Sequence, residues 1–222
     1  MDQLFERTSI RKAYFVLAMP VVLSMAVTLI YNMVDTYFVS QTQNPDLVAG
    51  VSQGAPLFTM MIAIGDIFGL GGSSVISRLF GEHHDLAGRF VSGYCFYASI
   101  VCGIIVTIMM LIFQVPFLHL LGASSSTWKY AREYYLVTAW GAPFVIFCLT
   151  PTNILRTEGL AVQSTIASMV GTGINIVLNP IFIFKCGWGA AGSALATVTS
   201  TIISDILMIY YTRVKSQKLT TS

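Results

Sequence analysis

Six long apolar runs dominate the chain, and their length constrains its fold more than any other feature. They cover approximately residues 13–38, 54–77, 90–114, 134–155, 160–184 and 188–212. A helix needs about 20 apolar residues to cross the hydrocarbon core of a bilayer, and each run reaches that length. Membrane β-strands are only about 10 residues long and alternate in polarity, which these runs do not. The runs therefore predict an all-α membrane protein, a bundle of six transmembrane helices.

The scarcity of charge supports a lipid environment for most of the chain. Only 10% of its 222 residues are charged and 55% are hydrophobic, whereas a soluble domain carries roughly 25% charged residues. The first run is too long for a signal-peptide core and has no small-residue cleavage site, so we interpret it as a retained helix. Because the loops are short, we expect one membrane lobe over residues 1–212, followed by a cytoplasmic tail or inter-lobe linker at residues 213–222.

Lys and Arg are distributed unevenly between the two predicted sides of the bundle. Nine of the twelve lie in the N-terminus, in the loops after the second and fourth runs, and in the C-terminal tail. Short loops that are rich in Lys and Arg stay on the cytoplasmic side. The distribution therefore predicts a multi-pass protein of the plasma (inner) membrane, surrounded by lipid, with both termini in the cytoplasm.

Polar side chains recur at helical spacing on three of the runs. Intervals of three and four residues place each set on one face of its helix. The sets are Ser24, Thr28, Tyr31 and Asp35 on the first run, with Asn32 beside them, Ser168, Thr172, Asn175 and Asn179 on the fifth, and Ser193, Thr197, Ser200 and Ser204 on the sixth. If the helices alternate in direction, Asp35, Asn175 and Thr197 reach a similar depth. The three stripes predict one polar cavity, provided that their helices are neighbours.

Asp35 is the ionisable group of this predicted cavity. A charge at the centre of a membrane helix costs about 2.5–3.5 kcal/mol on insertion scales, and such groups usually face a bundle interior or a water-filled cavity. Clustered oxygen atoms suit a proton or a small hard cation. We therefore predict an ion-binding site made of Asp35, Asn175, Asn179 and Thr197. The candidate cavity-lining residues are Ser24, Thr28, Tyr31, Asn32, Thr172 and Thr201.

Other interpretations of the membrane acids are open at this point. Asp35 lies about one helical turn from the outer end of its run, where water could simply hydrate it. Asp66 lies in mid-span beside glycines and has no matching polar stripe. Asp205 lies near the predicted cytoplasmic end of the sixth run, and we interpret it as a residue that reaches the interface.

Small residues and prolines indicate how the helices pack. Gly65 and Gly69 form a GxxxG pattern, which favours the close approach of two helices in lipid. Pro20 is predicted to bend the first helix, because proline removes one backbone hydrogen bond. The four cysteines form no CxxC motif, and we expect neither a metal site, beyond a small cation at Asp35, nor a cofactor. We also find no enzyme motif and expect no nucleic-acid partner.

Six segments, in order along the chain, resemble one family of transporters. They are PVVLSMAVTLIYNMVDTYFVS (20–40), GLGGSSVISRLFGEHH (69–84), LHLLGASSSTWKYAREYYLVTAWGAPF (118–144), LRTEG (155–159), NIVLNPIFIF (175–184) and GWGAAGSALATVTS (187–200). Their order and spacing resemble the first six helices of the multidrug and toxic compound extrusion (MATE) family. The resemblance covers nearly the whole chain and implies the fold of one MATE lobe.

The resemblance also implies a function, that of an antiporter exporting organic cations and drugs in exchange for H⁺ or Na⁺. It implies that Asp35 carries the coupling ion, that Asn175, Asn179 and Thr197 line the same cavity, and that the first helix bends at Pro20. Some members of the family have an Asp at the position of Asn179, so Asp35 alone supplies charge here. Family members have about twelve helices in two lobes, as transporters built from repeats do. The resemblance therefore implies a second six-helix lobe as a partner.

Two other functions are weighed against this one. The chain could be a half-length fragment or assembly subunit that does not transport. It could also be a flippase for lipid-linked oligosaccharides from the same superfamily, but such sites are strongly cationic. The six runs contain no Lys or Arg, which counts against a flippase.

Overall fold

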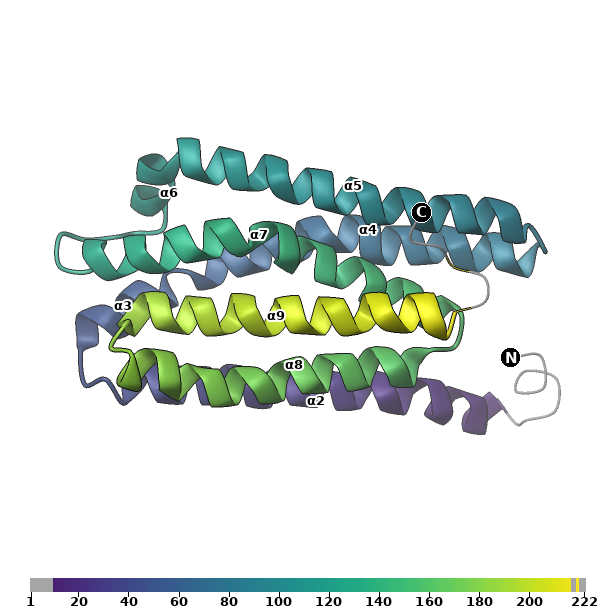
Figure 1. Cartoon of the computed structure of the whole chain (residues 1–222), viewed down its shortest axis with the longest axis horizontal. Helices are drawn as coiled ribbons and strands as arrows, with labels where there is room; N and C mark the ends of the chain where they lie inside the picture. Colours follow the sequence, from purple (N-terminus) through teal and green to yellow (C-terminus); the bar gives the residue numbers. More distant parts are fainter. Residues whose placement is uncertain (1–9, 217–218, 220–222) are drawn as a thin grey trace.

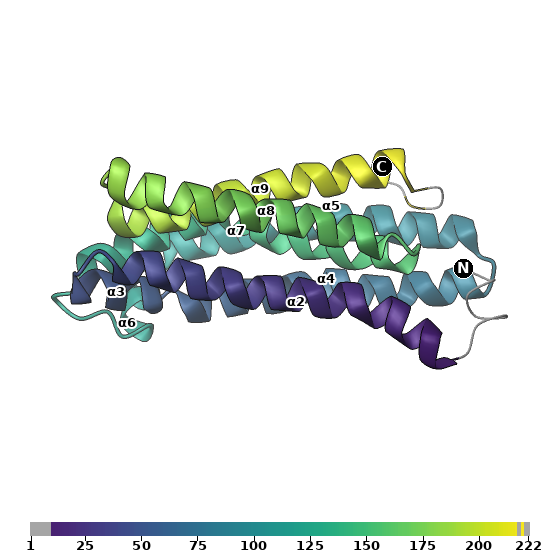
Figure 2. The ribbon, with the colours of Figure 1, turned by 90° about the horizontal axis from the view of Figure 1, so that it is seen from below.

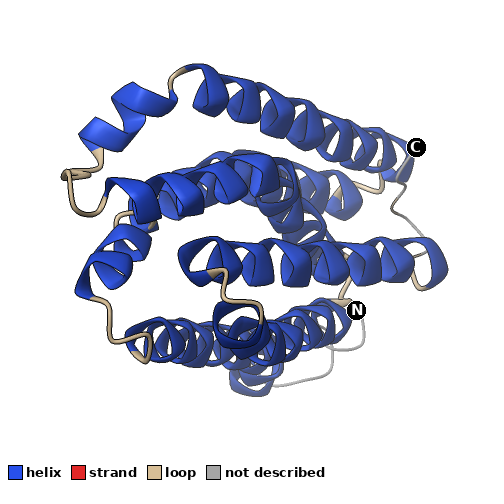
Figure 3. Ribbon diagram, turned by 60° about the vertical axis from the view of Figure 1, so that its left-hand side comes forward, coloured by secondary structure: helices blue, strands red, loops and turns tan. Residues whose placement is uncertain are grey.

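Six long helices form the described part of the chain, which covers residues 10–216 and 219 of the computed structural model. They are α2 (Ile10–Ser40), α4 (Ala55–Gly81), α5 (Asp85–Ile112), α7 (Trp128–Thr157), α8 (Ala161–Pro180) and α9 (Gly189–Val214). Two short helices, α3 (Pro45–Ser52) and α6 (Gln114–Leu120), and a π-helical turn, η1 (Ile181–Lys185), complete the order. These residues contain no β-strand, so the predicted all-α class is confirmed (Figure 3).

Helix α7 is the central element of the bundle. It packs against α4, α5 and α9 and makes smaller contacts with α3 and α8. Helix α2 packs mainly on α8, with smaller contacts to α3 and α9. The long helices run along one axis, so that α2 begins and α9 ends at the same end of the bundle (Figure 1). In the view from below, the first turns of α2 bend away from the rest (Figure 2).

The outer surface of the bundle is apolar, as expected for a protein surrounded by lipid. Phe90, Tyr94 and Ile112 on α5, for example, are 78%, 71% and 69% exposed. Five helical segments in the described residues are long and apolar enough to cross a membrane, and they are Pro45–Gly81, Asp85–Ile112, Trp128–Thr157, Ala161–Lys185 and Gly189–Val214. Several side chains of α2 are not described, so the sixth span stays a prediction.

Helices α4 and α7 approach each other closely because α4 presents glycines to α7. A Cβ atom on Gly65 would lie 2.7 Å from the carbonyl oxygen of Ile146, and one on Gly69 would lie 2.6 Å from that of Leu149. Both glycines are buried. Lipid gives helices no hydrophobic reason to associate, so such close backbone packing must hold them together. The predicted packing role of the GxxxG pattern is therefore confirmed.

The helix ends differ from the predicted apolar runs for local reasons. Helix α7 begins at Trp128, because a polar first turn precedes the apolar run. Helix α8 ends at Pro180, and the chain continues as the π-helical turn η1. Gly187 and Gly189 then adopt positive φ angles of 69° and 47°, a conformation that glycine adopts without steric cost. This turn reverses the chain and starts α9 beside the end of α8.

Candidate functional site

Asp35 joins three helices at one end of the bundle. Its Oδ1 atom accepts a hydrogen bond from Asn179 Nδ2, at the end of α8, over 2.5 Å. The same oxygen accepts a second hydrogen bond from Ser193 Oγ, near the start of α9, over 3.2 Å. Bonds to a charged group each contribute about 1.5–3 kcal/mol. The helices that carry the three predicted stripes are therefore neighbours, and Asp35 lies where they meet.

A chain of side-chain amides continues from Asp35 into the bundle. Asn179 Nδ2 also donates to Asn175 Oδ1 over 3.2 Å, and Asn175 Nδ2 donates to Thr197 Oγ1 over 3.3 Å. Thr197 Oγ1 in turn donates to the backbone carbonyl of Ser193. The structure thus brings together all four residues that the sequence assigned to an ion-binding site.

The oxygen atoms of this network suit a proton or a hard cation. Asn175 and Asn179 are 1% and 0% exposed, whereas Asp35 is half-buried. The Oδ1 atom of Asn179 is buried and has no hydrogen-bond partner among the described residues. The two donors to Asp35 are a neutral amide and a neutral hydroxyl, and neither balances its charge. A carboxylate with nearby amide and hydroxyl oxygens is the kind of ligand set that hard cations prefer.

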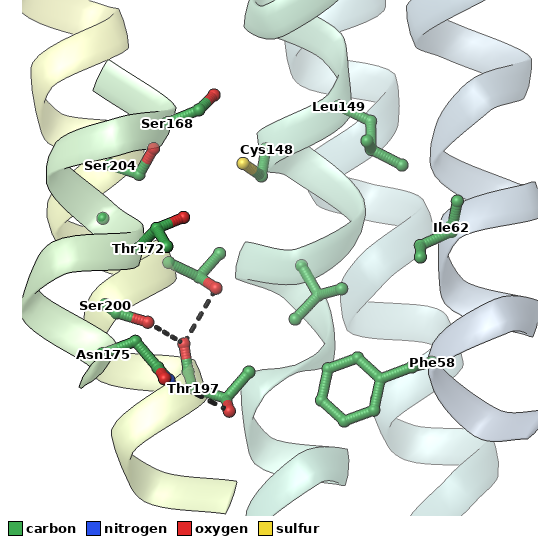
Figure 4. A pocket seen from close by; sticks show the side chains of 13 residues that line it. Phe58, Ile62, Cys148, Leu149, Ser168, Thr172, Asn175, Thr197, Ser200 and Ser204 are labelled. Atoms are coloured by element: carbon green, nitrogen blue, oxygen red, sulfur yellow. Dashed lines mark hydrogen bonds between the residues drawn. The ribbon is translucent and has the colours of Figure 1, made fainter. Parts of the chain in front are cut away.

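A cavity of about 250 Å³ extends from this network between α4, α7, α8 and α9. Its lining comprises Phe58, Ile62, Val145, Cys148, Leu149, Ser168, Gly171, Thr172, Asn175, Thr197, Ser200, Thr201 and Ser204. The hydroxyl and amide groups come from α8 and α9 and face the apolar side chains of α4 and α7 (Figure 4). One wall is therefore polar and the opposite wall apolar, which suits a molecule that has both kinds of surface.

The predicted lining residues have different positions in the structure. Thr172 and Thr201 line the cavity, together with Asn175 and Thr197. Asn32 is exposed on α2 and does not line this cavity. The side chains of Pro20, Ser24, Thr28 and Tyr31 lie outside the described residues, although their backbone is helical. Their predicted roles in lining the cavity and in bending the helix stay predictions.

Ser193 is a site residue that the predicted ion-binding set lacks. It contacts Asp35 directly because it lies one turn before Thr197 on the same face of α9. The stripe of serines and threonines on the sixth run contained this signal. Sequence alone could not show which member of the stripe would meet Asp35, because that depends on where the turn after η1 places α9.

Comparisons with known proteins identify the family of the chain. A family model described as MatE matches residues 20–181. The multidrug export protein MepA of Staphylococcus haemolyticus is 32% identical over 215 residues, which are 97% of this chain and 48% of that protein. The chain thus spans about half the length of the curated relatives it matches.

Solved structures give the same result for the fold. A MATE protein in a straight conformation superimposes with a TM-score of 0.90 at 32% identity, over 99% of this chain and 49% of the other. A MATE protein in a bent conformation gives a TM-score of 0.87, also at 32% identity, over 95% of this chain and 47% of the other. With the matched family model and an all-helical, apolar bundle, these likenesses show that the chain is a multi-pass membrane protein of the MATE family.

Proposed function

We propose that the chain is one lobe of a multidrug efflux antiporter in the plasma membrane, which exports organic cations and drugs in exchange for H⁺ or Na⁺. The observation that carries the proposal is the position of Asp35. It is held by side chains of α8 and α9 next to a cavity with one polar and one apolar wall. The relatives that are named multidrug export proteins support the same activity.

Exchange requires that the ion and the substrate influence each other's binding. A bound H⁺ or Na⁺ neutralises Asp35, and a cationic substrate then loses its attraction to that carboxylate. Binding of either cation changes the contacts of α2 with α8 and α9, and a ligand shifts a conformational equilibrium by its difference in affinity for the two states. We infer that ion binding favours a bent α2 and a smaller cavity, so that the substrate leaves.

A second six-helix lobe completes the proposed transporter. Pockets for drug-sized molecules have volumes of about 300–1,000 Å³, and the cavity of this lobe is smaller, at about 250 Å³. Transporters built from repeats place their substrate between the repeats. We therefore propose that another lobe, in the same polypeptide or in a second chain, supplies the other wall, with both ends of this chain in the cytoplasm.

The transport proposal predicts ion-driven movement of a cationic dye. Residues 1–214 are joined to the C-terminal half of the Staphylococcus haemolyticus MepA protein and reconstituted in liposomes. A pH gradient or a Na⁺ gradient, imposed separately, is expected to drive dye against its concentration gradient, and fluorescence quenching measures the flux. The chain without a second lobe is the control and is expected to move no dye. Dye flux that neither gradient drives would contradict the antiport.

Asn179 provides a test of Na⁺ as the coupling ion. Asn179→Leu removes a buried amide oxygen beside Asp35, and we expect Na⁺ binding to weaken about tenfold, which corresponds to about 1.4 kcal/mol. Titration calorimetry of the purified chain measures the affinity. Asn32→Leu is the matched control, because Asn32 is exposed on the same helix as Asp35 and is expected to have no effect. Equal Na⁺ affinity in both variants would rule out Asn179 as a ligand.

A further inference from the structure

A second acid lies inside the bundle, on α9 about three turns beyond the Asp35 site. Asp205 on α9 is only 3% exposed. The interpretation of Asp205 as an interface residue is therefore wrong. Side chains of α5 and α7 line an apolar cavity together with Asp205.

The carboxyl group of Asp205 has almost no polar surroundings. Both of its oxygen atoms are buried and have no hydrogen-bond partner among the described residues. Its neighbours include Ile100 from α5, Phe144 and Phe147 from α7, and Ile206 from its own helix. They line an apolar cavity of about 220 Å³ beside the carboxyl group. None of these neighbours can neutralise or solvate a negative charge.

Among the described residues, the titratable group that faces Asp205 is the thiol of Cys148 on α7. Cys148 and Ser204 both line the cavity of about 250 Å³ described above. Figure 4 shows the Cys148 side chain directed toward the helix that carries Ser204. The side chains of α5 and α9 that line the apolar cavity together with Asp205 are aliphatic. A thiol is neutral and a weak hydrogen-bond donor, so it does not compensate a carboxylate.

A row of side chains connects Asp205 with the Asp35 site. Ser193, Thr197, Thr201 and Asp205 are each four residues apart on α9, so successive members lie one turn apart and the row winds gradually around the helix. Twelve residues separate Ser193 from Asp205, which is about 18 Å along the axis. Thr197 and Thr201 line the cavity between the two acids. Ser204 and Cys148, which lie next to Asp205, also line this cavity, whereas Asp205 itself lines the apolar one.

We propose that Asp205 is a second proton-binding site of this lobe and is occupied by a proton in this conformation. An isolated carboxylate buried in apolar surroundings is so costly that the group takes up a proton instead. A neutral carboxylic acid fits the site without a cationic partner. The lobe then holds two acids in different surroundings, one hydrogen-bonded by amide and hydroxyl groups and the other beside a thiol. This proposal does not depend on transport.

Infrared spectroscopy of the purified chain in lipid tests the proposal, because an un-ionised carboxyl group has its own carbonyl-stretch band. At neutral pH, wild-type protein is expected to show this band, and Asp205→Asn is expected to lose a component of it. Asp46→Asn is the matched control, since Asp46 is exposed on α3 and its removal is expected to leave the band unchanged. Identical bands in wild type and Asp205→Asn would overturn the proposal.

A second variant keeps the proposal testable if Asp205→Asn does not fold. Cys148→Ala retains Asp205 and removes the thiol beside it. The carbonyl band of a protonated Asp205 is expected to shift in frequency in this variant, because the thiol beside the carboxyl group is lost. A band that is unchanged in both position and intensity would show that the protonated group is not Asp205, and would overturn the proposal without reference to any transport assay.

Discussion

Asp35→Asn is expected to abolish ion-driven dye flux in the two-lobe protein, reducing it to the level of empty liposomes. The substitution keeps the shape of the side chain and a hydrogen-bonding oxygen for Asn179 and Ser193. It removes the charge, which is the property that a proton or Na⁺ requires. We therefore expect the protein to fold and to bind dye while the gradient no longer drives transport. Dye flux under a pH gradient and under a Na⁺ gradient measures the effect.

Asp66→Asn is the matched control for this prediction. Asp66 is also an acid in a long apolar helix, but it is not among the residues that line the cavity or contact Asp35. We expect it to retain most of the flux. Gradient-driven transport by Asp35→Asn at the wild-type rate would show that the coupling ion binds elsewhere, and the proposed role of Asp35 would have to be abandoned.

Gly69→Ala is expected to destabilise the lobe by about 1–3 kcal/mol, the usual cost of overfilling a packed interface. The added methyl group would lie 2.6 Å from the carbonyl oxygen of Leu149 and 2.8 Å from Nδ2 of Asn153. The first of these is a backbone atom of α7, so one of the two helices has to move. Thermal or SDS-induced unfolding of the purified chain measures the change in stability.

Gly71→Ala is the matched control, two residues further along the same helix. A Cβ atom at this position meets nothing within 4 Å, and Gly71 is exposed. Because Ala is favoured over Gly in helices by roughly 1 kcal/mol, this variant should be as stable as wild type or slightly more stable. If both variants unfold alike, the close approach of α4 and α7 at Gly69 does not contribute to stability.

The long helices and the Asp35 site could be predicted because they depend on local regularities. The length of each apolar run gives the helices, and spacing of three and four residues places Asp35, Asn175 and Thr197 on inward faces. The short helices α3 and α6 could not be found in this way, because they are shorter than any membrane-spanning run. The π-helical turn after Pro180 could not be predicted either, because its residues continue the same apolar run.

The burial of Asp205 shows where this kind of reasoning fails. Position along a helix estimates depth in the membrane, but the exposure of a side chain depends on which neighbour covers its face. Here α7 brings Cys148 and Phe147 to that face, and α5 brings Ile100. No pattern within residues 188–212 carries that information. The contact of Ser193 with Asp35 could not be predicted for the same reason, because it depends on how α2, α8 and α9 pack together.

The attachment of α2 has a mechanical consequence. Helix α2 packs mainly on α8 and makes fewer contacts with α3 and α9, so a single helix–helix interface holds most of its length. A movement of α2 leaves the tightly packed helices α4 and α7 undisturbed. The free energy that it requires therefore depends on a few hydrogen bonds and on the side chains between α2 and α8. Under the proposed antiport, this interface is where ion binding at Asp35 would be converted into movement of α2.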